Sequence, residues 1–179
     1  MEHNYLAEEQ IERLVNDAAA YIRDQRQKYL ERATPLSAED KLILKRFFPN
    51  PILDMARFLN VENEKMENPK FLSQLNDQGF SFPDINSFGG TTFRDVIVWR
   101  VNLTSRLKFH ELVHVTQYQK LGLHGFADKY MRGLLNKGKY RAIPLEEHAY
   151  ELDERFIENP DKFFSVEAEV VDWMVKGRY

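Results

Sequence analysis

The sequence has no cysteine among its 179 residues. A disulfide framework and a thiolate zinc site are therefore both excluded, and a metal ion would have to be bound by histidine and carboxylate side chains. No apolar run approaches the roughly 20 residues of a membrane span. The first residues, MEHNYLAEEQIERL, lack the basic start and apolar run of a signal peptide. We therefore expect a cytoplasmic protein without a membrane partner.

The chain also lacks an excess of positive charge. Lysine and arginine number 25, and aspartate and glutamate 28, which gives a formal net charge of −3. This composition offers no electrostatic case for a nucleic-acid partner. Neither an internal repeat nor a linker interrupts the sequence, and 43% of its residues are hydrophobic. We therefore expect residues 1–179 to form a single domain with a sizeable core.

Hydrophobic periodicity predicts a mainly helical chain. Apolar residues recur at three- and four-residue spacing from Leu6 to Ala33, which predicts one long N-terminal helix, within residues 1–34, packed on the core. Further helices are expected at 37–47, 71–78, 101–120, 126–135, 144–157 and 163–175, with loops at 60–69 and 79–90. Periodicity does not decide whether residues 52–61 form a strand or a helix, and Thr91–Arg100 is the best strand. The expected fold class is α+β and predominantly helical, with a small β-sheet next to helix 101–120.

The helix predicted over 101–120 contains the motif H-E-x-x-H, in FHELVH (109–114). His110 and His114 are four residues apart, so their side chains lie about 40° from each other on one helix face, with Glu111 beside them. With this spacing two imidazoles bind one zinc ion while the glutamate acts as general base. A buried helix with two hydrogen-bonded histidines would show the same pattern. Apolar residues on nearly every side of the helix predict burial, and one metal ion would then satisfy all three polar groups.

A third ligand is expected on the helix over 144–157, where Glu146, Glu147 and His148 compete. The apolar stripe of that helix consists of Leu145, Ala149, Leu152 and Phe156. At about 100° per residue, Glu147 points away from this stripe into solvent. Glu146 and His148 lie on opposite flanks, and helix geometry alone does not choose between them. The mixed flank that Glu146 shares with Tyr150 and Asp153 suits a half-open cleft, which favours Glu146.

Three stretches together resemble a known group of proteins. FHELVHVTQYQKLG (109–122), GFADKY (125–130) and YRAIPLEEHAYELDERF (140–156) are similar to small bacterial proteins of the zincin metallopeptidase superfamily, of the gluzincin type with HExxH and a downstream ExxA. In that branch the third zinc ligand is the first residue of E-x-x-[SA]-D, a position held here by Glu146. The resemblance covers about the C-terminal half of the chain and leaves out the long N-terminal helix.

The chain departs from the E-x-x-[SA]-D pattern at its last position, where it has Tyr150. The carboxylate that would orient a zinc-bound histidine is therefore missing there, and Asp153 or a backbone carbonyl would have to replace it. In the zincin-like fold the strand before the HExxH helix lines the substrate groove. Residues 91–100 match that position more loosely and could pair with an extended peptide.

The resemblance implies a zinc metallopeptidase that acts on a peptide or protein substrate. Zn²⁺ would be bound by His110, His114 and Glu146, and Glu111 would be the catalytic general base. The donors to the developing oxyanion stay open among residues near the third-ligand helix, namely Tyr140, Arg141, His148 and Tyr150. Two further positions are expected either to support the site or only to pack, namely Gln117 and Tyr118.

Two other classes of function fit the sequence. The first is a zinc-binding regulatory or interaction module without peptidase activity, because the aspartate after E-x-x-A is missing. The second is a helical interaction protein without a metal, organised by its N-terminal helix. Metal analysis separates the second class from the other two.

Overall fold

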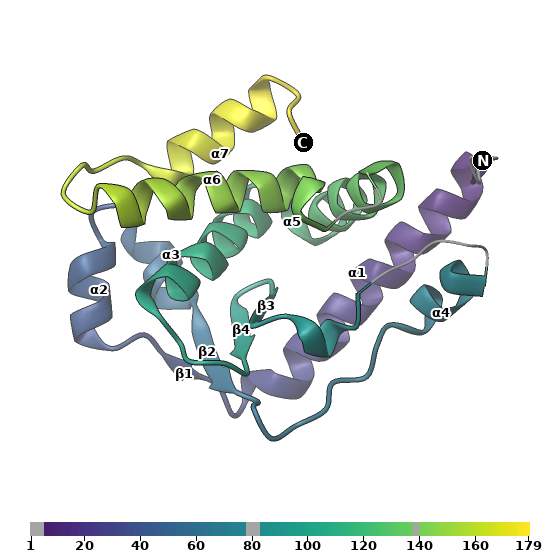
Figure 1. Cartoon of the computed structure of the whole chain (residues 1–179), viewed down its shortest axis with the longest axis horizontal. Coiled ribbons are helices and arrows are strands. Elements are labelled where there is room, and N and C mark those ends of the chain that lie inside the picture. The colour runs from purple at the N-terminus through teal and green to yellow at the C-terminus, as the bar shows by residue number, and fades with distance from the viewer. Residues whose placement is uncertain (1–5, 78–82, 138–139) are drawn as a thin grey trace.

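The computed structural model describes residues 6–77, 83–137 and 140–179. In these residues helices dominate and surround a small mixed sheet (Figure 1). The helices are α1 (Glu8–Leu30), α2 (Ala38–Leu44), α3 (Asn50–Met55), α4 (Lys70–Asp77), α5 (Ser105–Lys137), α6 (Pro144–Glu158) and α7 (Val166–Val175). The strands are β1 (Thr34–Pro35), β2 (Arg57–Asn60), β3 (Gly90–Phe93) and β4 (Val96–Trp99), with short 3-10 helices at Ile85–Ser87 and Tyr140–Ala142. The expected α+β, predominantly helical class is confirmed.

Residues 79–82 of the predicted loop 79–90 lie outside the described residues, as do Gln78 at the end of the predicted helix 71–78 and residues 138–139. His3, near the start of the chain, also lies outside them. Within the described ranges, no helix combines the length and apolar character that crossing a membrane requires.

The sheet has the strand order β1-β2-β4-β3, with β2 and β4 parallel and the other two pairs antiparallel. The single strand predicted over 91–100 is wrong, because these residues form the hairpin of β3 and β4. The chain reverses between them, where Arg94 has a φ of 62°. Asp95 in this turn pairs with Arg26 of α1, which ties the hairpin to the first helix. The ambiguous residues 52–61 divide into the end of α3 and the strand β2.

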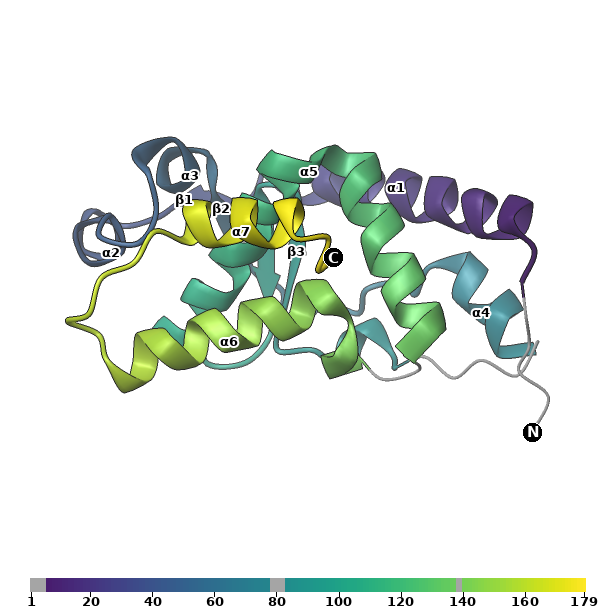
Figure 2. The ribbon, with the colours of Figure 1, turned by 90° about the horizontal axis from the view of Figure 1, so that it is seen from above.

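Helix α5 crosses the middle of the molecule and changes direction within its length (Figure 2). Its residues from Phe109 to Tyr118 are all buried, as the apolar surroundings of the motif predict. At Gly122 the backbone has φ 72° and ψ 171°, which only glycine adopts readily. The helix predicted over 101–120 therefore begins at Ser105 and ends where expected, and the predicted helix 126–135 is the arm of α5 after Gly122.

Helices α1, α6 and α7 all pack against α5. One apolar cluster joins α2, α3, the first arm of α5, α6 and α7. A second joins α1, α4 and the second arm of α5, and a third joins the end of α1 to the sheet. His114 lies between the first two, since Val113 and Val115 belong to one and Tyr118 to the other. The buried residues of α1 belong to the second and third of these clusters.

Candidate metal centre

Helices α5 and α6 bring three predicted ligands to one point. His110 and His114 project from one face of α5, and Glu146 comes from the first turn of α6. Nε2 of His110 lies 3.2 Å from Nε2 of His114. Oε2 of Glu146 lies 3.4 Å from the first of these nitrogens and 3.5 Å from the second. All three side chains are buried, and the cluster can hold a metal ion.

The three distances fit a tetrahedral ion. Ligand atoms about 2.0–2.1 Å from such an ion lie about 3.3–3.4 Å from each other. An octahedral ion at the same bond lengths would bring adjacent ligands to about 2.9 Å. In addition, Oε2 of Glu146 is buried and makes no hydrogen bond with the described residues, although it faces both imidazoles. A buried carboxylate oxygen without a hydrogen bond needs another partner, and a cation between the three atoms would provide it.

His110 is oriented by a carboxylate from α6. Its Nδ1 lies 2.9 Å from Oδ2 of Asp153, and Asp153 in turn pairs with Arg106 at 2.7 Å. Because a carboxylate held by arginine is an acceptor, Nδ1 carries the hydrogen and the lone pair of Nε2 faces the cluster. Asp153 thus occupies the place left open by Tyr150, as one of the two sequence-based options predicts. The ring of Tyr150 lies against that of His110, with centroids 4.6 Å apart.

His114 is oriented by an amide on its own helix. Its Nδ1 lies 2.8 Å from Oε1 of Gln117, whose Nε2 donates to the carbonyl of Leu145 at 3.0 Å. This second hydrogen bond turns the amide oxygen of Gln117 toward the imidazole. Nδ1 of His114 is therefore also a donor, and the lone pairs of both Nε2 atoms point into the same space. Of the two readings considered for Gln117, the structure favours support of the site.

Without a metal, the acidic groups dominate the electrostatics of the cluster. Burial alone would lower the pKa of His110, but Asp153 and Glu146 outweigh it and raise this pKa to about 10. Burial likewise opposes a raised pKa at His114, where Glu146 again outweighs it. Burial would raise the pKa of Glu146, but the two histidines hold it well below its usual value. The site therefore attracts positive charge, which protons or a metal ion can supply.

Glu111 is held by the hairpin rather than by the cluster. Its Oε2 accepts a hydrogen bond of 2.6 Å from Oγ1 of Thr92 in β3. Gly90 lies so close that a Cβ atom there would be 2.5 Å from Oε1 of Glu111. Burial raises the pKa of Glu111, which makes it a better proton acceptor. Sequence reasoning missed Thr92 and Gly90 as neighbours of Glu111, because their contact with it depends on where the hairpin lies.

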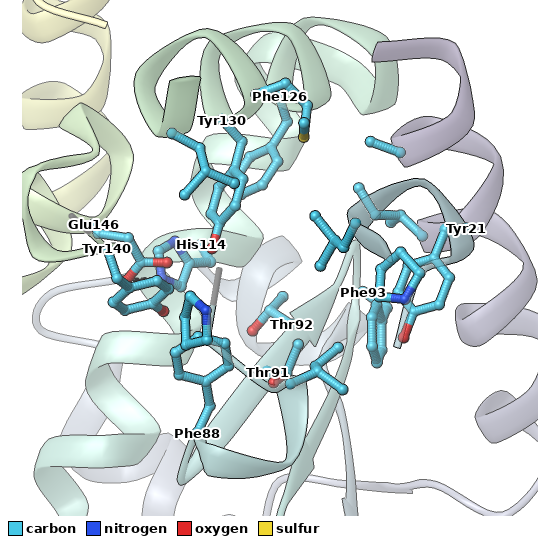
Figure 3. A pocket seen from close by; sticks show the side chains of 18 of the residues that line it. Tyr21, Phe88, Thr91, Thr92, Phe93, His114, Phe126, Tyr130, Tyr140 and Glu146 are labelled. Carbon is cyan, nitrogen blue, oxygen red and sulfur yellow. Dashed lines mark ion pairs between the residues drawn. The ribbon is translucent and has the colours of Figure 1, made fainter. Parts of the chain in front are cut away.

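A cavity of about 150 Å³ opens from this site. Glu111, His114 and Glu146 line one end, and the walls come from α1, β3 and the second arm of α5. Figure 3 shows Glu146 and His114 on one side of the cavity and Tyr21 on the other. The polar groups thus face a space in which a substrate could lie.

The residues considered as donors to a substrate lie in different places. Tyr140 lines the cavity on the side of Glu146, and its ring stacks on Phe88 with centroids 4.4 Å apart (Figure 3). Arg141 stacks instead over Tyr150, 4.5 Å from the ring centroid, and neither lines the cavity. Tyr130 does line it, on the second arm of α5, and sequence reasoning missed it. The sequence does not indicate in which direction the helix continues after the kink at Gly122, so it could not place Tyr130 at the site.

The other candidate ligands on α6 lie away from the cluster. Glu147 is exposed, as the helix geometry predicts. His148 is buried, but its Nδ1 lies 2.6 Å from the hydroxyl of Tyr179 and its ring stacks on Trp173 at 4.0 Å. The structure thus brings Glu146, and not His148, to the two histidines of α5. His124 is exposed just after the kink.

Comparisons with family models, curated proteins and solved structures find no match to this chain. We therefore derive its function from the residues of the cluster and their geometry.

Proposed function

We propose that this protein is a zinc-dependent peptidase with a zincin-like fold. One observation carries the proposal: the three ligand atoms of His110, His114 and Glu146 lie 3.2–3.5 Å apart at one end of the cavity that Glu111 also lines. A pair of structural histidines requires neither a buried acid such as Glu146 nor a second carboxylate such as Glu111 beside a cavity. A catalytic zinc site with two histidines and one glutamate uses both, Glu146 as the third ligand and Glu111 as the general base.

Zinc is the metal that this donor set favours. Two imidazoles and one carboxylate suit zinc, whereas magnesium and calcium prefer oxygen ligands alone. The separations of 3.2, 3.4 and 3.5 Å also lie closer to tetrahedral than to octahedral spacing. Three protein ligands leave the fourth tetrahedral position open for a water molecule, as in catalytic zinc sites.

Glu111 and its neighbours would perform the proton transfers. A zinc ion at this site would supply a Lewis acid, which acidifies water and polarises a carbonyl oxygen. Glu111 takes a proton from the attacking water, whose oxygen bonds to the scissile carbonyl carbon. When the carbon–nitrogen bond breaks, Glu111 returns the proton to the leaving amine. Thr92 fixes one carboxylate oxygen of Glu111, and the missing side chain of Gly90 leaves the other free.

Tyr140 is the donor that we assign to the developing oxyanion. It lines the same cavity as Glu111 and Glu146. Burial first, and then the negative charge of Glu146, raise the pKa of Tyr140 well above its usual value. Its hydroxyl therefore stays protonated and able to donate throughout the neutral range.

The substrate backbone would lie along β3, the edge strand beside the site. The carbonyl of Thr92 points away from β4, since it accepts a hydrogen bond of 3.3 Å from the hydroxyl of Tyr118. An extended peptide would pair with this outward-facing edge of β3. This arrangement corresponds to the groove-lining strand that the zincin resemblance implies, with β3 in place of the whole segment 91–100.

The test combines metal analysis with the Glu111→Gln variant. Protein purified without added metal should contain about one zinc per chain in wild type and variant, because Glu111 is not a ligand. Hydrolysis of a broad peptide library should fall by orders of magnitude in the variant. Zinc in both proteins without hydrolysis by wild type would favour the regulatory or interaction module. Absence of zinc from both proteins would favour the helical interaction protein without a metal.

The third ligand has its own matched pair of variants. Glu146→Ala should lose most of the bound zinc, whereas Glu147→Ala, one residue away and exposed, should keep it. His148→Ala should also keep zinc, although the loss of stacking on Trp173 should lower the melting temperature. Full zinc occupancy in Glu146→Ala, measured by elemental analysis, would contradict the assignment.

A further inference from the structure

The cavity beside the metal ligands is apolar over almost all of its wall. Its lining beyond Glu111, His114 and Glu146 includes no other acidic, basic or histidine residue among those that the structure describes. The large apolar and aromatic side chains of this wall include Phe71, Phe88, Phe93, Phe126, Met131 and Leu134. A charged group that entered beyond the metal site would find no partner of opposite charge, and burial of an unpaired charge is costly.

Two of the tyrosines in the wall already have partners for their hydroxyl groups. Tyr21 donates to the carbonyl of Glu67 at 2.8 Å, and Tyr118 donates to the carbonyl of Thr92 at 3.3 Å. Their rings therefore offer apolar surface to the cavity, while their polar atoms are used elsewhere. The polar groups that remain gather near Glu146, where Tyr130 and Tyr140 lie (Figure 3). The cavity thus has a polar end at the metal site and an apolar end toward α1.

The size of the cavity suits one large side chain. Its volume is about 150 Å³, and an apolar cavity of about that volume holds a benzene molecule. A phenyl ring or an isobutyl group would fill the cavity and make close van der Waals contacts with its wall. A methyl group would leave most of it empty.

Helix α1 closes the far end of the cavity. It contributes Ala18, Tyr21 and Ile22, and Tyr21 packs edge-on against Phe93 of β3 with centroids 6.1 Å apart. Ala18 is buried and has the smallest side chain of the three, so its size sets the depth that remains. This helix lies outside the segments that resemble zincins, and its part in the cavity follows from the structure alone.

We infer that this cavity binds the substrate side chain next to the scissile bond and selects large apolar residues, phenylalanine and leucine first. The side chain must be adjacent to the cleaved bond because the cavity starts at the residues that would act on that bond. Ala18 of α1 is then the residue that determines which side chains fit. The inference rests on the proposed peptidase function.

The first arm of the test measures selectivity in zinc-loaded protein. Peptides that carry Phe, Leu, Ala, Lys or Glu on either side of the cleaved bond are compared by kcat/KM. At one of the two positions, Phe and Leu should exceed Ala by about tenfold or more, and Lys and Glu should be the poorest. The Ala18→Leu variant, which fills the far end, should shift the preference from Phe toward Ala. Ile22→Ala, which enlarges the cavity instead, should improve the cleavage of Trp relative to Phe.

Ala20→Leu is the matched control for this arm. Ala20 lies two residues from Ala18 on the same helix, so its side chain is rotated by about 200° around the helix axis. It does not line the cavity. This variant should keep the selectivity of wild type, and all variants should keep their zinc. Equal cleavage of Phe, Ala and Lys peptides by wild type would overturn the inference. An unchanged preference in zinc-loaded Ala18→Leu would also overturn it.

The second arm needs no turnover and uses toluene as the probe. Toluene should raise the melting temperature of wild type and of Ala20→Leu, but not that of Ala18→Leu. Absence of toluene binding to wild type would show that the cavity does not accept an apolar group. If toluene binds as expected but no peptide is cleaved, the peptidase proposal fails while the apolar binding site stands. The two failures are thus distinguishable.

Discussion

Gly90 has no side chain and therefore leaves room for the carboxylate of Glu111. A Cβ atom at this position would lie 2.5 Å from Oε1 and 2.9 Å from Cδ of Glu111. In Gly90→Ala the carboxylate must move, because it is the mobile partner of the contact. We expect zinc content and melting temperature to change little, while kcat falls by about tenfold or more, since the base loses its position.

Gly89→Ala is the control for this variant. A Cβ atom at Gly89 would lie 3.0 Å from Cγ2 of Val101, whose side chain is exposed and can move away. This neighbouring substitution should leave both the peptidase rate and the zinc content as in wild type. Equal rates for Gly90→Ala and wild type would show that Glu111 is not the base.

Gln117 supports the metal through the nitrogen of His114 that does not face the cluster. Replacement by leucine keeps the volume but removes the acceptor 2.8 Å from Nδ1. We expect Gln117→Leu to weaken zinc affinity by about 10- to 100-fold, measured by competition with a chelator. Thr116→Val is a suitable control, because Thr116 is equally buried on α5 but donates only to the carbonyl of Leu112. If Gln117→Leu binds zinc as tightly as Thr116→Val does, Gln117 only packs.

At the scale of elements, the ligand-bearing helices were predictable because their signals are local. The spacing of His110 and His114 fixes their common face, and the apolar stripe of α6 identifies Glu147 as exposed. The choice of Glu146 over His148 needed the flanking residues and the family resemblance as well. Asp153 was one of two options for the orientation of His110, because its reach depends on how closely α6 approaches α5.

The hairpin was less predictable, for a physical reason. Arg94 adopts a left-handed φ of 62° where a turn-favouring glycine or asparagine would be expected. Without that signal, residues 91–98, which are rich in β-branched side chains, look like one strand. The neighbours of Glu111 therefore could not be assigned from sequence, and neither could the part of the cavity wall that α1 forms.

The kink of α5 at Gly122 directs the second arm, which carries Phe126 and Tyr130, toward the cavity. Its φ of 72° and ψ of 171° belong to a region that is almost restricted to glycine. A Cβ atom there would meet nothing within 4 Å, so Gly122→Ala isolates the backbone effect. We expect a loss of stability of about 1–3 kcal/mol, seen by chemical or thermal unfolding.

Gly125→Ala provides the opposite case on the same arm. Gly125 is helical, and its added Cβ would lie at an ordinary 3.4 Å from Cβ of Leu121. Alanine favours the helix over glycine by about 0.5–1 kcal/mol, so this variant should be as stable as wild type or more so. A similar loss in both variants would mean that helix packing, rather than the backbone at Gly122, limits stability.

At the scale of the whole molecule, the buried cluster couples folding to pH. The pKa of His110 rises from 6.5 to about 10 in the metal-free fold, so its stabilisation is complete below pH 6.5 and is lost as pH rises toward 10. The pKa of Glu146 is lowered from 4.5, so its contribution is present above pH 4.5 and is lost below that value. The metal-free protein should therefore be most stable between pH 4.5 and 6.5.

Zinc should change the shape of this profile and not only its height. Bound zinc requires neutral imidazoles, so protons do not stabilise the zinc-loaded protein. Above pH 6.5 the histidines of the unfolded chain are also neutral, and the zinc-loaded protein therefore keeps its stability there. Below pH 6.5, protons bind the histidines of the unfolded chain and compete with zinc for the folded site. Zinc therefore stabilises the protein less at these pH values. Melting temperatures of zinc-loaded and chelator-treated protein should consequently diverge from about pH 6.5 upward and converge as pH falls toward 4.5. Two parallel profiles would mean that His110 and His114 do not exchange protons for a metal ion.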